Sequence, residues 1–279
     1  MDDITTTTTK FSPPHRVKAW CGRQREAYRR HALRTACPRA TEAASRIPAA
    51  VREAWRGHAA RELPGLSVDD GAWLRCSIGL AQFFEACRLQ EAHGPCALPS
   101  RAADSVWHAW LAFDPEGLSA WQQRHFGRVL DHVESHALNA PLDACLARSW
   151  AGACRSEGLS PLARRLPLLF ALDGMLRVPT GWAYRHEGAT LVHQPIDGFG
   201  QASGAAVAHA AVGAAALTAM GLVTPLELRA RRRDDGAGAS CGSSVASDGP
   251  GCSGDAGAGC DGGGSSCGSG CGGGCGGGG

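Results

Sequence analysis

The sequence predicts an all-α fold, an irregular bundle of about six to eight helices with a small β-hairpin near 182–193 and a disordered Gly/Cys tail. Two observations lead to this prediction. Through most of the first 180 residues, apolar side chains recur at helical spacing, and prolines and glycines divide the chain into segments of helix length. By contrast, residues 236–279 contain 20 of the 38 glycines and 6 of the 13 cysteines but no Trp, Leu, Ile or Phe. Such a segment cannot bury enough apolar surface to offset the entropy of ordering it.

These patterns divide the chain into a disordered N-terminus at 1–12, a helical body at 13–230, and a disordered Gly/Cys/Ser-rich tail at 234–279. The N-terminus lacks the apolar stretch of a secretory signal, so we expect a cytoplasmic protein whose cysteines are thiols or metal ligands. The arginine runs are short and lack interleaved aromatic residues, which argues against nucleic-acid binding. The segment 202–223 is rich in Ala and Gly and includes a histidine, which argues against a membrane span.

The first helices can be placed from their start and stop signals. Prolines open a helix at 13–33 and a second at 38–63, which Pro48 should kink or divide. Ser67-Val-Asp-Asp70 resembles a capping box and begins a helix at 68–90. That last segment is apolar nearly all round, so we expect it at the centre of the core.

The segment 99–134 carries the most regular helix signals, together with three tryptophans and three histidines. We expect a helix at 100–113, capped by Ser100, and a second at 115–127, which begins with a proline after an aspartate cap. Gly127 is a natural left-handed end for the second helix. The chain beyond it could then fold back beside the first helix.

The remaining elements are shorter. A helix is expected at 141–158 and a short apolar helix at 167–178. The segment 182–193 alternates weakly and is typical of a hairpin that turns at Glu187-Gly188. The first 180 residues require no sheet, so strands are expected only in this later region.

Asp104 and His108 stand four residues apart and therefore share one face of the predicted helix. They could bind a zinc or copper ion together, with His132 as a third ligand where the chain folds back. Three protein ligands would leave an open position, as catalytic zinc sites do. The alternative ligands are His125, Asp131 and His136.

A structural interpretation of the same residues is also open. Asp104 could accept a hydrogen bond from His108 or from a tryptophan indole and so hold the two helices together. The HEXXH signature of zinc enzymes is absent from the sequence. So are the nucleophile elbow, the Walker loop and a strand-anchored GxGxxG, which leaves hydrolase, NTPase and dinucleotide-binding functions without support.

The tail offers a second candidate metal site. Its last cysteines, Cys267, Cys271 and Cys275, stand four residues apart and could offer soft thiolates to Zn or Cu(I). Zinc modules surround their ligands with aromatics and turns, which this tail lacks. A plain flexible appendage, or a tail whose cysteines are chemically modified, are the alternatives.

The segments LPSRAADSVWHAWL, HFGRVLDH and RRLPLLFALDGMLRVPTGW resemble a family of uncharacterised bacterial glycine-rich domain proteins. In that family a SRAxDxxWHxF(I/L) helix precedes FGxxLxH and then RLPLLFALD, and a Cys/Gly tail ends the chain. The Asp-x-x-Trp-His core is also similar to the glycine-rich domain proteins of plants. The resemblance implies a fold but no activity.

Position by position, the resemblance marks two groups of residues. The family positions are Asp104, Trp107, His108, Phe126, Gly127 and His132, and the fold positions are Leu166, Pro167 and Asp173. The family often has YxxFC between its first two motifs, whereas this chain has SAWQQRH, with His125 near the place of the cysteine. This departure argues against thiol-dependent chemistry at the site.

Three functional hypotheses follow. The first is a protein-interaction or accessory domain with a flexible tail, which binds another protein and needs no catalytic geometry. The second is a metal-binding protein or metal-dependent enzyme that uses Asp104, His108 and His132, with tail thiols beside it. The third is a precursor or carrier whose Cys/Gly tail is modified.

Overall fold

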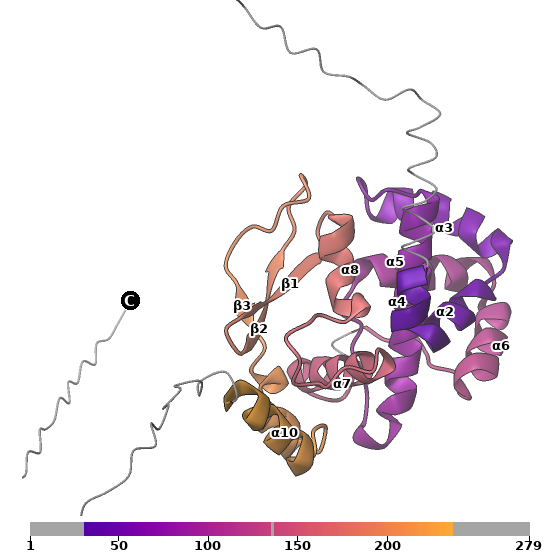
Figure 1. The fold of residues 1–279 in the computed structure, drawn as a ribbon. Coiled ribbons are helices and arrows are strands. Elements are labelled where there is room, and N and C mark those ends of the chain that lie inside the picture. Colours follow the sequence, from indigo (N-terminus) through magenta and orange to yellow (C-terminus); the bar gives the residue numbers. More distant parts are fainter. Residues whose placement is uncertain (1–30, 135–136, 237–279) are drawn as a thin grey trace, which may run out of the picture. The chain divides into compact units, whose positions relative to one another are not determined.

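Helix α4 (Asp70–Leu89) lies at the centre of a computed structural model that describes residues 31–134 and 137–236 (Figure 1). Every residue from Cys76 to Cys87 on this helix is buried, which confirms its predicted place in the core. The helix begins at Asp70, two residues later than predicted, because Asp69 is the cap. The Asp69 carboxylate accepts a hydrogen bond of 2.7 Å from the Ala72 amide.

Seven further helices of eight or more residues accompany α4 in the described part of the chain, so the predicted helical bundle is confirmed. They are α2 (Pro38–Ser45), α3 (Ala49–Glu62), α5 (Arg101–Phe113), α6 (Pro115–Phe126), α7 (Leu142–Ser156), α8 (Leu168–Leu176) and α10 (Pro225–Gly236). The shorter elements are α9 (Ala214–Ala219) and the 3-10 turns η1 (Glu91–His93) and η3 (Ala210–Val212). The predicted helix at 13–33 lies mostly outside the described residues, although 31–36 are helical.

Proline and glycine set the boundaries around the helices. Pro48 divides the predicted helix 38–63 into α2 and α3, and it occupies the cap position of α3. Gly127 ends α6 in the left-handed conformation, with φ of 76°. Gly152 on α7 touches α4, since a Cβ built there would lie 2.7 Å from the Ala86 backbone. These two helices can pack so closely only because residue 152 has no side chain.

Helices α5 and α6 carry the caps that the sequence predicts. The Ser100 hydroxyl accepts from the Ala103 amide at 3.2 Å, and the Asp114 carboxylate accepts from the Gly117 amide at 2.9 Å. The apolar positions of the two helices are buried as expected: Ala103, Val106, Trp107 and Trp110 on α5, and Leu118, Trp121 and Phe126 on α6.

Asp173 connects three elements. Its buried carboxylate, on α8, accepts hydrogen bonds from the Ser100 hydroxyl (2.6 Å) and from the amides of Arg101 (3.0 Å), Ala102 (3.0 Å) and Trp182 (3.1 Å). Asp173 therefore joins the start of α5 to the first strand. The two other fold positions flank α8: Pro167 is buried at its cap, and Leu166 packs against the core.

Three short antiparallel strands follow: β1 (Trp182–Glu187), β2 (Thr190–Pro195) and β3 (Val207–Ala208). The hairpin of β1 and β2 was predicted, and its two-residue turn at Gly188-Ala189 lies one residue later than expected. Strand β3 was not predicted, and it lies beyond the segment 182–193 in which the sequence indicates strands. Its pairing places His193 of β2 between Tyr184 on β1 and Val207 on β3.

No helix among residues 31–134 and 137–236 is long and apolar enough to cross a membrane. The segment 202–223, whose composition argued against a span, is divided among β3, η3 and α9. The predicted N-terminal segment 1–12 and the cysteines of the tail lie outside the described residues.

Candidate functional site

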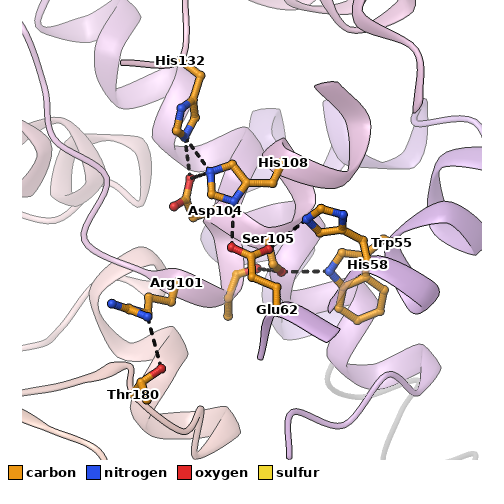
Figure 2. Close-up of polar contacts among 10 residues, drawn as sticks. Trp55, His58, Glu62, Arg101, Asp104, Ser105, His108, His132 and Thr180 are labelled. Atoms are coloured by element: carbon orange, nitrogen blue, oxygen red, sulfur yellow. Dashed lines mark hydrogen bonds and ion pairs between the residues drawn. The ribbon is translucent and has the colours of Figure 1, made fainter. Parts of the chain in front are cut away.

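Three predicted ligands converge at the edge of α5. Asp104 and His108 come from that helix, and His132 comes from the segment that follows α6 (Figure 2). The His132 Nε2 atom lies 3.0 Å from Asp104 Oδ1 and 3.1 Å from His108 Nε2. The third separation, from His108 Nε2 to Asp104 Oδ1, is 3.7 Å. One oxygen and two nitrogens therefore surround a single point.

The return of the chain after α6 brings His132 to this point. Gly127 reverses the direction of the backbone, and the amide of Leu130 then donates to the Gln122 side chain at 2.6 Å. The His132 ring packs edge to face with Trp107, with 4.7 Å between ring centroids. Trp107 is buried, so it provides a fixed wall for the imidazole.

Glu62, at the end of α3, also belongs to the site, although the sequence did not predict it. Its Oε1 atom lies 2.7 Å from His108 Nδ1, and its Oε2 atom lies 3.1 Å from His58 Nε2 (Figure 2). Helix α3 is fixed against α5 by a buried hydrogen bond of 2.9 Å from the Trp55 indole to Ser105. The spacing of His58 and Glu62, four residues apart on one helix face, was the signal that could have drawn attention to them.

Glu62 and His108 shift the pKa values of each other. Burial raises the pKa of Glu62, but the hydrogen bond and charge of His108 and the proximity of His58 outweigh it, so the pKa is lowered overall. The hydrogen bond to Glu62, aided by the charge of Asp104, raises the pKa of His108. A carboxylate at Nδ1 keeps a proton on that nitrogen, so Nε2 is the atom that His108 presents to Asp104 and His132.

The spacing of the three atoms suits a metal ion. Bonds of about 2.0–2.1 Å to nitrogen and oxygen separate neighbouring ligands by about 2.8–3.4 Å at octahedral or tetrahedral angles. Two of the separations fall in this range, and the third exceeds it slightly. His58, Glu62 and His108 form a second close group, in which the Glu62 carboxylate bridges the two imidazoles.

The other predicted ligands that the structure describes, His125 and Asp131, do not join this group. His125 lies on α6 against the Trp121 ring, with 5.6 Å between centroids. Asp131 is exposed, and His136 lies outside the described residues, as do Cys267, Cys271 and Cys275. The indole alternative is also not seen, because the Trp107 and Trp110 indole nitrogens have no hydrogen-bond partner in the described part of the chain.

A comparison with protein-family models matches residues 51–206, more than half of the chain, to the UCP032817-like family. The chain belongs to the UCP032817-like family. No curated protein and no solved structure matches it. The matched segment contains Glu62, Asp104, His108 and His132, so the whole cluster belongs to the UCP032817-like part of the chain.

The cluster of this UCP032817-like protein opens into a cavity of about 1080 Å³. Its walls include the aromatic side chains Phe83, Trp107, Trp182 and Tyr184. A volume of this size accommodates a small organic molecule. The cavity also contains a second polar chain, formed by Asp143, His193 and His209, which the sequence analysis did not single out.

Arg101 lies one turn before Asp104 on α5 and lines the same cavity. Its guanidinium donates to the Thr180 hydroxyl at 3.2 Å (Figure 2) and has no carboxylate partner within the described residues. Thr180 has φ of 64°, which is strained for a β-branched residue. Such strain is typical of functional sites, where it holds a side chain in a required position.

Proposed function

We propose that this protein binds one divalent first-row transition metal ion through Asp104 Oδ1, His108 Nε2 and His132 Nε2, and that it uses the ion on a small molecule in the adjoining cavity. The convergence of these three atoms carries the proposal. Two histidines and one carboxylate are the ligands of many zinc enzymes and of non-haem iron(II) enzymes.

The orientation of His108 supports the proposal. Metal-binding histidines commonly donate their second N–H to a carboxylate, which fixes the tautomer and makes the ligating nitrogen more basic. Glu62 occupies this position at 2.7 Å from Nδ1. This contact also favours one ion over two, because a second ion at His58 and Glu62 would have to displace the proton on His108 Nδ1.

The number of ligands supports a chemical role. Three protein ligands leave at least one coordination position open, and the cavity lies beside it. A metal ion in such a position acts as a Lewis acid or lowers the pKa of bound water. The walls of the cavity would supply the rest of the binding site.

Arg101 indicates that the molecule bound in the cavity is anionic. Its guanidinium has only the Thr180 hydroxyl as a partner among the residues described, and it faces the same cavity as the metal ligands. Arginine is well suited to bind carboxylate and phosphate groups in pairs of hydrogen bonds. We therefore infer that the molecule bound in the cavity carries such a group.

The other hypotheses have no comparable support. No observation identifies a protein partner or a modified tail, so both stay predictions. Membership of the bacterial glycine-rich domain proteins also stays a proposal, and it carries no activity.

Metal analysis and zinc titration of the full-length protein test the proposal. The wild type should bind one more equivalent of metal than His132→Ala. Both proteins keep the tail, so this difference does not depend on any metal that the tail binds. His93→Ala is the matched control, because His93 is exposed and lies outside the cluster. Glu62→Gln should keep the ion but weaken its affinity about 10- to 100-fold, as loss of a partner behind a ligand does.

Cobalt spectra identify the ligands in the same samples. The Co²⁺ bands lost in His132→Ala should lack the intense thiolate charge-transfer absorption that cysteine ligands produce. Equal metal content in the wild type and a folded His132→Ala variant would contradict the proposal.

A further inference from the structure

A second hydrogen-bonded chain lines the cavity. His193 Nδ1 lies 2.7 Å from His209 Nε2, and His209 Nδ1 lies 3.1 Å from Asp143 Oδ1. His193 belongs to β2, His209 directly follows β3, and Asp143 lies in the first turn of α7. Three elements that are distant in sequence therefore meet in one series of polar side chains.

The arrangement of these polar atoms differs from the arrangement at the proposed metal site. The atoms of the metal site converge on one point, whereas His209 uses its two nitrogens in opposite directions. Such a series cannot surround one ion, but it does fix the positions of protons. Asp143 accepts from Nδ1–H of His209, and Nε2 of His209 then accepts from Nδ1–H of His193.

This order leaves Nε2 of His193 available. Across the described parts of the chain, that atom has no hydrogen-bond partner, and it is not one of the fully buried nitrogens without a partner. His193 is half-buried and lines the cavity. Trp182 packs edge to face with the His193 ring at 4.9 Å, and Tyr184 packs against it at 5.5 Å, so the ring is held in place.

The surroundings of His193 keep it neutral near pH 7. Burial lowers the pKa of His193, as does the charge that His209 carries when it is protonated, while the charge of Asp143 raises it. Among the described residues that pack against the His193 ring, Tyr184 is also titratable, but burial raises its pKa, so its hydroxyl stays protonated. His193 therefore presents an unprotonated Nε2 atom to the cavity.

On the basis of the function proposed above, we propose that His193 is the proton-transfer residue of the cavity and that His209 and Asp143 are its positioning residues. The proton donor would be water, or a hydroxyl of the anionic molecule that Arg101 and the metal ion hold. Neutral imidazoles with a free nitrogen are the commonest general bases in enzymes.

The step can be written with its atoms balanced. Nε2 of His193 takes a proton from the oxygen, the O–H bond breaks, and its electron pair stays on the oxygen. The new charge on His193 is stabilised through Nδ1–H, which donates to His209, and by the Asp143 carboxylate behind that ring. The return of the proton to the product restores the neutral His193.

Long-range ¹H–¹⁵N NMR of the full-length, metal-depleted protein tests the tautomers. His193 and His209 should both carry their proton on Nδ1, the minor tautomer of free histidine. Asp143→Ala should return His209 to a mixture of tautomers and reduce the fraction of His193 with an unprotonated Nε2. Glu187→Ala, which removes an exposed carboxylate at the hairpin turn, should change neither residue.

Reaction with diethyl pyrocarbonate tests whether Nε2 is available, because the reagent modifies accessible unprotonated imidazole nitrogens. Peptide mass spectrometry should find His193 modified at least as fast as the exposed His93, and several-fold more slowly in Asp143→Ala. A His193 whose Nε2 atom is enclosed or protonated would not react. An unreactive His193 beside a modified His93, or a rate that does not depend on Asp143, would overturn the proposal.

Metal analysis of His193→Gln separates this proposal from the proposed function. The variant should keep the metal equivalent that His132→Ala loses. Loss of that equivalent in His193→Gln would make His193 a support of the metal site, and the proton-transfer role would be wrong. If the wild type and His132→Ala bind equal amounts of metal, the proposed function fails, while the tautomers and the reactivity still decide the role of His193.

Discussion

Trp107 and His108 are neighbours on α5, but they have different surroundings. Trp107 is buried against Phe83 and Phe84, with ring centroids 5.7 and 4.8 Å away, whereas His108 lies at the border of the apolar face. The indole contributes apolar burial and supports the position of His132. The imidazole contributes polar contacts that water can partly replace.

Trp107→Ala should therefore destabilise the protein by about 3–5 kcal/mol, because it removes buried surface and leaves a cavity. His108→Ala should cost about 1–3 kcal/mol, because Glu62 loses one hydrogen-bond partner. Urea denaturation of the two variants measures both effects. The reverse order of stability would mean that α5 does not face the core through Trp107.

Asp173 is a residue whose role is structural. Four donors point at its buried carboxylate, so Asp173→Asn places a donor amide among them. Since hydrogen bonds to a charged group contribute about 1.5–3 kcal/mol each, the loss should be at least about 3 kcal/mol. Thermal melting measures it, and Asp131→Asn, which changes an exposed carboxylate, provides the comparison. A melting temperature equal to that of Asp131→Asn would refute the structural role of Asp173.

At the scale of elements, strand β1 contains a histidine, His186, whose burial is unfavourable. Both ring nitrogens of His186 are buried and have no hydrogen-bond partner within the described chain, and the ring packs against Trp150 at 5.5 Å. Burial, followed by the charges of Arg164 and Arg231, lowers the pKa of His186. The unfolded chain, where the pKa is about 6.5, binds this proton more readily, so stability decreases as the pH falls below that value.

His186→Phe should consequently stabilise the hairpin, by about 1–3 kcal/mol through removal of the buried polar atoms. The advantage over the wild type should be larger at pH 5.5 than at pH 8, because the variant has no proton to take up on unfolding. Melting curves at the two pH values measure the effect, with His93→Gln as an exposed control. An advantage that shrinks at low pH would contradict the lowered pKa of His186.

Elements that are determined by local signals could be predicted from the sequence, whereas contacts between distant elements could not. Caps such as Ser100 and the end of α6 at Gly127 are local signals, so helices and the approach of His132 to α5 could be foreseen. Glu62 was missed because its contact with His108 spans 46 residues, and no local pattern records that α3 packs on α5. His209 was missed for a similar reason, since it depends on β3, a strand of only two residues.

At the scale of the molecule, one cavity is bounded by elements that lie far apart in the sequence. Helix α5 and the segment after α6 carry the proposed metal ligands, while β2, β3 and α7 bring the proton-transfer chain. Asp173 holds the start of α5 to β1, and thereby connects the two sets of elements. The relative position of the two polar centres therefore depends on the fold as a whole.

The proposed metal ligands all lie in the helical body, so metal binding there should not depend on the tail. Deleting residues 237–279 should leave the melting temperature nearly unchanged, because Val245 is the only large apolar side chain in that segment. Its glycine runs also have a high conformational entropy, which any docking on the body would have to overcome.

The truncated protein should keep the equivalent of zinc that depends on His132, since all of the proposed ligands of that ion lie between residues 104 and 132. Thermal melts and metal analysis of the two chains measure both outcomes. If the zinc is lost together with the tail, the site lies at Cys267, Cys271 and Cys275 instead, and thiolate bands in the Co²⁺ spectrum of the full-length protein would identify it.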